Sequence, residues 1–355
     1  MDQGDGAEIR DKILAILKDR PGAYLPGHEI SRRVGISRAA LWKQMGLLRR
    51  AGHPISAKPR LGYTLVPGGI QHARTKLLGR RLLQFLRVSS TNEIAKRLAA
   101  DGVIEGTVVM ADEQRQGKGR MGRPWASPRG GLWFSVILRP PRAARAQAHQ
   151  LAFLAGVAVA LGIRRETALD ARLKWPNDVI INGRKVCGVI GEMVNVGLLA
   201  RPQPRPGKGN PEQRAPRSPS TLLNHAAPQA VVIGVGINSN IDYNRLPPEV
   251  RANATSLQLE LGRQVSAPRL LAAIFEELER LYETWQQRGL APAIEEWLTL
   301  DCTVGNEVCV EAVGETFFGR VAGIDPEGRL LVDVEGGRTR AVAAGDVTLR
   351  KQRQG

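Results

Sequence analysis

The chain has 355 residues, of which 43% are apolar and 24% are charged, a composition that excludes a wholly disordered or fibrous protein. At about 150 residues per domain, this length predicts two or three domains. Lysine and arginine number 51 against 34 aspartate and glutamate, and the net charge of +17 favours polyanionic partners without selecting among them.

The three cysteines form no CxxC pair and the five histidines are scattered, so the sequence predicts neither a disulfide framework nor a zinc site. The first residues lack the basic and then apolar layout of an export signal. The longest uncharged apolar run, 151–163, is too short to span a bilayer. We therefore expect a reduced, cytoplasmic protein without a membrane partner.

Residues 1–68 are predicted to form a winged helix-turn-helix domain. The predicted elements are a first helix that ends at Pro21, helices over 27–34 and 38–51, and a β-hairpin over 55–66. Ser37 is the expected N-cap of the third helix, and the helix-turn-helix covers about 27–46. The hairpin would be the wing.

Basic residues outnumber acidic ones by 12 to 6 in the first 70 residues, so DNA could accept the third helix in its major groove. The candidate DNA-binding residues are Ser37, Arg38, Lys43, Lys58 and Arg60. The alternative is a small helical interaction module with a solvated basic face.

From about 75 to 300, helical and strand patterns alternate, as expected of a central α/β domain with a mixed sheet. Residues 201–227 break the pattern with six prolines, five basic residues and one acid, too little apolar surface to offset the cost of ordering. We expect a flexible insertion between two strands. Short glycine-containing strands then predict a small β-barrel over 301–352, and the whole chain is expected to be an α+β multidomain protein.

The segment Gly117 to Gly122 reads GKGRMG and matches the GxGxxG pattern of dinucleotide-binding turns. A Rossmann turn opens a helix, whereas prolines at 124 and 128 forbid one here. Lys118 is followed by glycine, which also excludes a Walker A loop. What remains is a basic glycine-rich loop that suits a ligand with a carboxylate and phosphates, or a solvated basic turn.

The segment 174–192 contains KWPND and an Asn182-Gly183 pair between apolar runs, a strong signal for a two-residue hairpin. In that register Ile180 lies opposite Lys185, whose ammonium would stand in a mostly apolar strand. A bound carboxylate would supply its partner, and nearby glycines permit close approach of a ligand. The alternative is an exposed edge lysine.

Two further motifs are weak in isolation. Ser90-Thr91-Asn92-Glu93 matches the S-x-x-E capping box, which explains Ser90 and Glu93 without any ligand. Residues 230–238 indicate a buried strand that ends in small residues and the amide of Asn238.

Over most of its length, the chain resembles the bifunctional biotin-protein ligases and biotin operon repressors of bacteria. The resemblance rests on five features in this order: the winged helix, SSTNE, DEQRQGKGRMGRPW, KWPNDVIINGRKVCGVIGE and GVGIN. That family couples biotin and ATP into biotinyl-5′-adenylate, with Mg²⁺ carried by ATP, and transfers biotin to a lysine of the biotin carboxyl carrier protein of acetyl-CoA carboxylase. Its repressor members form a homodimer with the adenylate bound as corepressor and occupy operator DNA. The resemblance also implies an SH3-like C-terminal barrel.

The resemblance assigns roles to residues of this chain. Biotin-binding residues would be Ser90, Thr91, Asn92, Gln114, Lys118, Gly119, Arg120 and Lys185. Residues for ATP and the adenylate would be Arg120, Arg123, Trp125 and Asn238. Lys185 and Arg120 would neutralise charge at the reacting phosphate, and Asp178 would accept the proton of the incoming lysine.

Two positions depart from the family pattern. Family loops commonly read GRGRRG, whereas Lys118 and Met121 stand here in place of two arginines. Lysine keeps the charge but loses bidentate geometry, and the missing cation should weaken retention of the adenylate.

Three alternatives remain open from the sequence. The first is a lipoate or octanoate ligase on the same scaffold. The second is a transcription factor whose ligase-like domain only senses a small molecule. The third is a biotin ligase whose N-terminal domain does not repress.

Overall fold

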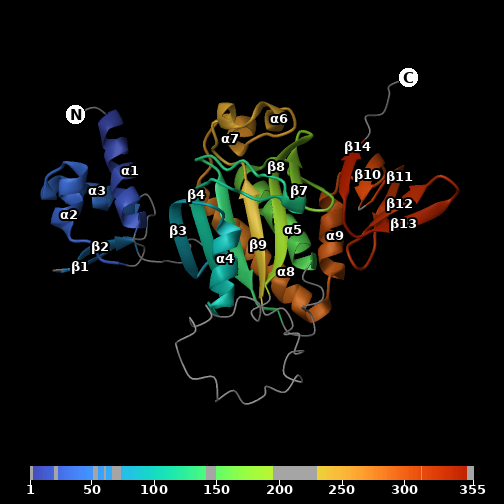
Figure 1. Cartoon of the computed structure of the whole chain (residues 1–355), viewed down its shortest axis with the longest axis horizontal. Coiled ribbons are helices and arrows are strands. Elements are labelled where there is room, and N and C mark those ends of the chain that lie inside the picture. Colours follow the sequence, from blue (N-terminus) through green and yellow to red (C-terminus); the bar gives the residue numbers. More distant parts are fainter. Residues whose placement is uncertain are drawn as a thin grey trace, which may run out of the picture.

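The computed structural model describes residues 3–19, 23–50, 55–59, 61–65, 73–140, 149–194, 230–312 and 314–349. A helical N-terminal domain lies at one end of the molecule, a central sheet with its helices in the middle, and a set of short strands at the other end (Figure 1). The predicted insertion at 201–227 and Arg60 fall outside the described residues.

The N-terminal domain is the predicted winged helix-turn-helix. Its elements are α1 Gln3–Asp19, α2 Gly27–Val34, α3 Arg38–Arg50, β1 Ile55–Lys58 and β2 Gly62–Leu65. The amide of Ala40 donates to Ser37 Oγ at 3.1 Å, which confirms the predicted N-cap. Ile30, Leu41 and Met45 are buried in a core that belongs to this domain alone.

The central sheet has seven strands in the order β3-β4-β5-β9-β8-β7-β6. Their bounds are β3 Arg81–Val88, β4 Thr107–Gln114, β5 Leu132–Leu138, β6 Arg172–Lys174, β7 Asp178–Ile181, β8 Arg184–Val194 and β9 Ala230–Ile237. β3 and β4 are parallel and the other neighbouring pairs are antiparallel, so the predicted mixed sheet is confirmed.

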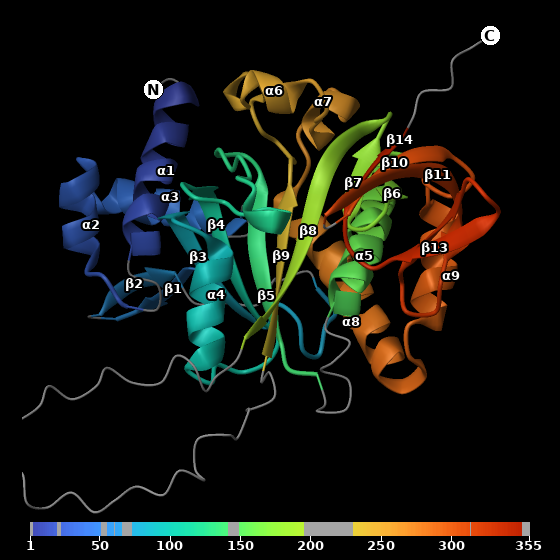
Figure 2. The ribbon, with the colours of Figure 1, turned by 45° about the vertical axis from the view of Figure 1, so that its right-hand side comes forward.

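Helices cover both faces of this sheet (Figure 2). α4 (Thr91–Ala100) packs on one face through Ala95 and Ala99, while α5 (His149–Thr167) and α8 (Ala267–Arg288) form two layers on the other. Alternate residues of each strand therefore face opposite layers, as Val108 and Val109 do. The α4 face is the thinner side of the molecule, and it holds the cavity described below.

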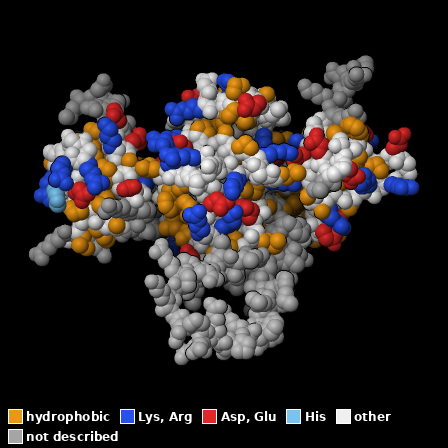
Figure 3. Space-filling model, viewed as in Figure 1, with side chains coloured by type: hydrophobic (Ala, Val, Ile, Leu, Met, Phe, Trp, Pro, Cys, Tyr) orange, Lys and Arg blue, Asp and Glu red, His pale blue; other side chains and the backbone are white. Residues whose placement is uncertain are grey.

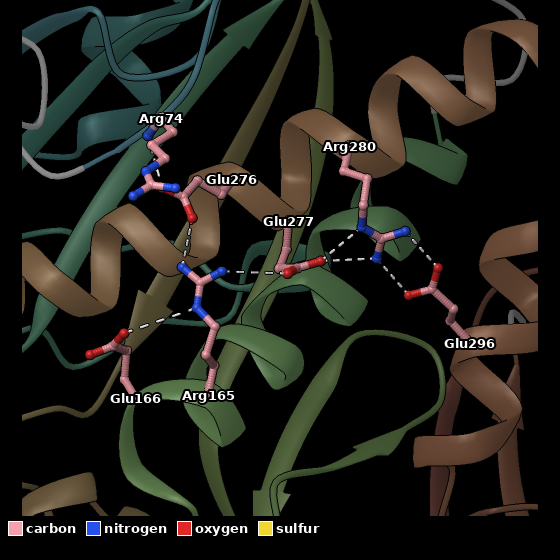
Figure 4. A network of polar contacts seen from close by, with 7 residues as sticks. All are labelled: Arg74, Arg165, Glu166, Glu276, Glu277, Arg280 and Glu296. Atoms are coloured by element: carbon pink, nitrogen blue, oxygen red, sulfur yellow. Dashed lines mark hydrogen bonds and ion pairs between the residues drawn. The ribbon is translucent and has the colours of Figure 1, made fainter.

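Ion pairs and a buried carboxylate fasten the outer helices. Figure 4 shows the surface network, which comprises Arg74, Arg165, Glu166, Glu276, Glu277, Arg280 and Glu296. Beside it, the buried carboxylate of Glu279 accepts the amides of Lys76, Leu77 and Leu78 at 2.5, 2.9 and 2.7 Å. Glu279 therefore holds the segment that leads from the N-terminal domain into the sheet.

The C-terminal strands form an antiparallel sheet in the order β13-β12-β11-β10-β14, after α9 (Ala291–Leu300). Their bounds are β10 Glu307–Ala312, β11 Glu315–Ile324, β12 Leu330–Val334, β13 Arg338–Val342 and β14 Asp346–Leu349. Val308 and Val332 are buried in the same core cluster as the central domain. The pairings of the described strands run in a line, so the small antiparallel domain is confirmed and its closure into an SH3-like barrel stays a prediction.

The N-terminal domain touches the central sheet through α1, which lies beside β3. Lys18 is 6% exposed, and its ammonium contacts both carboxylate oxygens of Asp112 at 2.9 and 2.7 Å. In the part of the chain that the structure describes, no helix is both long enough and apolar enough to cross a membrane.

Candidate active site

A cavity of about 460 Å³ opens on the α4 face of the sheet. The predicted site residues that line it are Ser90, Thr91, Asn92, Gln114, Lys118, Gly119, Arg120, Arg123, Trp125, Asp178, Lys185 and Asn238. These residues come from five separated stretches of sequence. The structure thus brings together every residue predicted for the biotin, adenylate and catalytic groups, while their roles remain predictions.

Glycines in the sheet make room for two larger side chains of the site. A Cβ on Gly234 would lie 2.2 Å from Asn92 Oδ1, and one on Gly236 would lie 2.5 Å from Trp125 Nε1. On the neighbouring strand, a Cβ on Gly188 would lie 3.0 Å from the Trp125 ring. We expected the strand glycines to leave space for a ligand. In the structure that space is filled by the side chains of Asn92 and Trp125, which line the cavity.

One end of the cavity is polar and uncharged. Gln114 Oε1 accepts from the amide and the hydroxyl of Thr91 at 2.8 and 3.1 Å, and Ser135 Oγ donates to Thr91 Oγ1 at 2.8 Å. Ser90, Thr91 and Asn92 are all buried. Hydroxyls and amides arranged in this way can exchange hydrogen bonds with a neutral polar ring without burying a charge.

Ser90 stands at the N-cap of α4, but its side chain makes no capping hydrogen bond. The capping box predicted for Ser90 and Glu93 is therefore wrong. The carboxylate of Glu93 instead contacts the ammonium groups of Lys118 and Lys96 at 2.6 and 2.8 Å. Two charge-assisted contacts outcompete one hydrogen bond to a backbone amide.

The glycine-rich loop is a hairpin and not the start of a helix. The amide of Gly119 donates to Arg123 O and that of Trp125 donates to Gly117 O, both at 2.8 Å. Only a single 3-10 turn, Arg120–Gly122, lies between, with Met121 at a φ of 54°. This geometry agrees with the rejection of a Rossmann turn.

Two arginines of the loop reach across the cavity to other segments. Arg120 donates to Asn177 Oδ1 at 3.2 Å and to Gly345 O at 3.3 Å, while Arg123 forms an ion pair with Asp346. Burial lowers the pKa of the Arg120 guanidinium, and the carboxylates of Asp346 and Asp178 oppose that shift. Arg120 is therefore a partly desolvated cation beside two acids.

The predicted hairpin register is confirmed, since Ile180 pairs with Lys185 across the strands β7 and β8. Asn182 and Gly183 both have positive φ values, 50° and 73°, as a type I′ turn requires. The Lys185 ammonium lies 2.6 Å from Asp178 Oδ1 and 5.2 Å from the centroid of the Trp125 ring. The lysine thus has a carboxylate partner within the protein, which the sequence did not indicate.

The adenylate side of the cavity contains an unsatisfied donor. Trp125 Nε1 is buried and has no hydrogen-bond partner among the described residues. Buried polar groups are usually paired, so an orphaned indole N–H at a cavity wall suits a ligand oxygen. Asn238 is already engaged, because its Nδ2 donates to Thr255 O at 3.0 Å.

Several cavity residues were missed by the sequence reasoning. They are Lys174 and Asn177 of the KWPND motif, Leu246, Val250 and Ala254 after β9, and Glu311, Asp346, Val347 and Thr348 of the C-terminal domain. Asn177 could have been found, since it lies inside a motif already singled out. Asp346 carries no local signal, and only the docking of the C-terminal strands brings it to Arg123.

The predicted DNA-binding residues lie far along the chain from this cavity, on the winged helix. Arg38 and Lys43 are exposed on α3, and basic side chains are visible on the N-terminal domain at the left of Figure 3. Arg60 and the side chain of Lys58 lie outside what the structure describes. Within the described ranges, no three His, Cys, Asp or Glu residues gather as a metal site.

Three family models match consecutive parts of the chain. They are an HTH domain over 10–64, the biotin/lipoate A/B protein ligase family over 85–200, and a biotin protein ligase C-terminal domain over 303–350.

Whole-chain relatives agree with these matches. A bifunctional ligase/repressor BirA of Bacillus subtilis is 32% identical over 345 residues, which cover 95% of this chain and 97% of that protein. The Escherichia coli protein of the same name is 28% identical and covers 96% of both chains. A solved biotin protein ligase from Aquifex aeolicus in complex with biotin and ATP, 24% identical, matches the fold with a TM-score of 0.60 over 76% of this chain and 98% of its own.

Proposed function

This chain belongs to the biotin-protein ligase family, and on that premise we propose that it is an ATP-dependent ligase that joins biotin to a biotin carboxyl carrier protein and a repressor that binds operator DNA. One observation carries the ligase assignment. One cavity has an uncharged polar end beside Thr91 and Gln114, and the cations Lys185 and Arg120 line the same cavity.

The first step forms biotinyl-5′-adenylate. A carboxylate oxygen of biotin attacks the α-phosphorus of ATP, the phosphorus–oxygen bond to pyrophosphate breaks, and pyrophosphate leaves. Two anions meet in this step, so catalysis needs cations that neutralise the developing charge. Lys185 and Arg120 supply them, and Mg²⁺ that accompanies ATP would supply further positive charge.

Binding roles follow from the two ends of the cavity. Ser90, Asn92 and the Thr91–Gln114 pair receive the polar ring of biotin. Lys118 and Gly119 of the glycine loop cover its tail. Arg123, Trp125 and Asn238 lie on the adenylate side, where the free Trp125 N–H donates to a ligand oxygen.

The second step transfers biotin. The ε-amine of the carrier lysine attacks the carbonyl carbon of the mixed anhydride, and AMP leaves with the electrons of the broken carbon–oxygen bond. The attacking nitrogen must lose a proton, and Asp178 is the acceptor. Its contact with the Lys185 ammonium at 2.6 Å places this carboxylate beside the cation of the reacting centre.

The N-terminal domain binds operator DNA through α3 and the wing, with Ser37, Arg38, Lys43, Lys58 and Arg60 as contacts. The adenylate acts as corepressor, and the adenylate-bound chain forms a homodimer, as the family resemblance implies. A dimer presents two recognition helices to two half-sites, which matches the way such domains read DNA.

The proposal also covers the domain bounds, the C-terminal barrel and the cellular location. The functional divisions are a DNA-binding domain over 1–68, a catalytic domain over 75–300 and a C-terminal domain over 301–352. The C-terminal strands close as an SH3-like barrel. The protein acts in the cytoplasm, where both the carrier and DNA are present.

The ligase assignment is tested with the full chain, biotin, ATP, Mg²⁺ and a biotin carrier domain. We expect the mass of the carrier to increase by one biotinyl group. Parallel reactions with lipoate and octanoate should leave the carrier unmodified, and modification by either acid in preference to biotin would refute the assignment.

The repressor assignment is tested by a gel shift on DNA upstream of biotin synthesis genes. Biotin and ATP together should strengthen a shift that weakens steeply with salt. If a chain lacking residues 1–66 shifts the same DNA equally well, the role of the winged helix is wrong.

A further inference from the structure

Glu93 has no role in the proposed chemistry, yet it lies where α4 meets the glycine loop. Its carboxylate contacts Lys118 Nζ of the loop at 2.6 Å and Lys96 Nζ of its own helix at 2.8 Å. The same Lys96 contacts Glu192 Oε1 of β8 at 2.9 Å. Glu93 therefore joins the loop to a polar cluster that is anchored in both the helix and the sheet.

The contact turns the ammonium of Lys118 toward α4, while the rest of the residue stays at the cavity. Lys118 lines the cavity, whereas Glu93 lies outside the cavity lining, so the ammonium turns toward α4 at the rim. The backbone around Lys118 belongs to the hairpin that Gly119 and Arg123 close. A fixed Lys118 side chain thus keeps the hairpin backbone over the polar end of the cavity.

We propose that the Glu93–Lys118 pair is a clasp that holds the glycine loop closed over the biotin end of the cavity, with Glu93 as a positioning residue that never touches the ligand. The inference rests on the proposed ligase function and deepens it. It explains why lysine suffices at position 118, since a single ammonium satisfies a contact that needs no bidentate guanidinium.

The carboxylate of Glu93 is ionised throughout the working range of pH. Hydrogen bonds from Lys118 and then Lys96 lower the pKa of Glu93 to about 2. The partners are also part of a larger network, because Glu192 Oε2 accepts from Asn92 Nδ2 at 2.7 Å. Asn92 lines the polar end, so the clasp and the ligand pocket share one rigid support.

The loop has a second set of anchors at its other side. Arg120 contacts Asn177 and Gly345, and Arg123 contacts Asp346 of the C-terminal domain. Glu93 supplies the attachment on the α4 side. Its removal should therefore open the biotin end of the loop while the adenylate end stays attached.

A competing explanation is that Glu93 only stabilises α4, because an acid in the first turn of a helix interacts favourably with the helix dipole. The two explanations differ in their dependence on Lys118. An effect through the clasp disappears when Lys118 is already neutral, whereas an effect through the helix persists.

The first test measures loop opening without any ligand. Trypsin is added to the full chain, and mass spectrometry follows cleavage after Arg120 in wild type, Glu93→Gln, Lys118→Met and the double variant. Lys118 and Glu93 are 48% and 30% exposed, and such pairs shift an equilibrium by up to about fivefold. We expect each single variant to be cleaved about threefold to fivefold faster, with the double variant no faster than the singles.

The matched control is Glu113→Gln. Glu113 is 25% exposed on β4 and pairs with Arg87 and Arg129, outside the glycine loop. Its cleavage rate in the loop should equal that of wild type. Equal rates for Glu93→Gln and Glu113→Gln, or multiplying effects in the double variant, would overturn the clasp.

The second test measures retention of the intermediate. Labelled biotinyl-5′-adenylate is formed from biotin and ATP and chased with excess unlabelled biotin, and its release is followed. Glu93→Gln should release it about threefold to fivefold faster and raise the KM for biotin, while kcat for adenylation changes less than twofold. An unchanged release rate, or a loss confined to kcat, contradicts the proposal.

The two tests separate this inference from the function on which it rests. If the variants are cleaved faster but the chain forms no adenylate, the proposed clasp is supported and the proposed ligase function is refuted. Normal adenylate formation with unchanged cleavage and release would refute the clasp alone.

Discussion

Replacing Lys185 with methionine tests the proposed chemistry most sharply among single substitutions. Methionine keeps much of the length and apolar stem of lysine but removes the ammonium that lies 2.6 Å from Asp178. It also leaves the Asp178 carboxylate without this partner, next to the position where the biotin carboxylate must approach the phosphate. Both changes disfavour the meeting of two anions.

The expected magnitude follows from the geometry. Two unit charges 4 Å apart interact by about 4 kcal/mol at an effective dielectric constant near 20. Removal of one preorganised charge stabiliser typically slows a reaction by about 10²- to 10³-fold. Lys185 is 35% exposed, so solvent screens part of its field and the lower figure applies. We therefore expect adenylation to slow by about 10²-fold.

The assay is biotin-dependent exchange of labelled pyrophosphate into ATP by the full chain. Arg184→Met is the matched control, because Arg184 is the preceding residue, is 39% exposed and is paired with Glu260 at 2.6 Å. We expect near wild-type exchange from the control. Exchange by Lys185→Met within a few fold of wild type would refute the assignment of Lys185 to the reacting centre.

Three further substitutions test other parts of the structure. Gly234→Ala places a Cβ 2.2 Å from Asn92 Oδ1 and should raise the KM for biotin at least tenfold in steady-state assays, whereas Gly323→Ala, with open space around it, should not. Asp178→Asn should slow transfer from preformed biotinyl-5′-adenylate to the carrier by about 10²-fold in a single-turnover assay, and transfer at the wild-type rate would exclude Asp178 as the proton acceptor. Glu279→Gln should lower stability by about 1–3 kcal/mol in thermal melts, because three backbone amides lose a carboxylate acceptor, and Glu276→Gln, which removes one such acceptor, should cost less.

Local patterns predicted much of the fold. The Asn182-Gly183 turn fixed the hairpin so closely that the pairing of Ile180 with Lys185 was predicted to the residue. The helix over 27–34 and the cap at Ser37 were predicted equally well. Turn chemistry, capping and helical periodicity act over a few residues, and therefore remain visible in the sequence.

Contacts between distant segments could not be predicted in this way. Arg123 and Asp346 are 223 positions apart, and Lys18 and Asp112 are 94 apart. Their pairing depends on how whole domains dock, which no local pattern encodes. Asp346 begins β14, an edge strand of the C-terminal sheet, and only the docking of that sheet brings it to Arg123.

Glu93 shows how a local pattern can mislead. The S-x-x-E sequence matches a capping box, but in the folded chain the carboxylate of Glu93 contacts the ammonium groups of Lys96 and Lys118 instead. The glycines near Lys185 give a similar lesson. They were expected to admit a ligand, and only the structure shows that the ring of Trp125 lies against Gly188.

A crystal structure with a non-hydrolysable biotinyl-5′-adenylate analogue would show whether one cavity binds both ends of the intermediate. We expect the biotin ring beside Thr91 and Gln114, with the Lys185 ammonium and the Arg120 guanidinium both within hydrogen-bonding distance of the acyl phosphate. An analogue bound elsewhere, or one whose acyl phosphate neither cation reaches, would contradict this expectation.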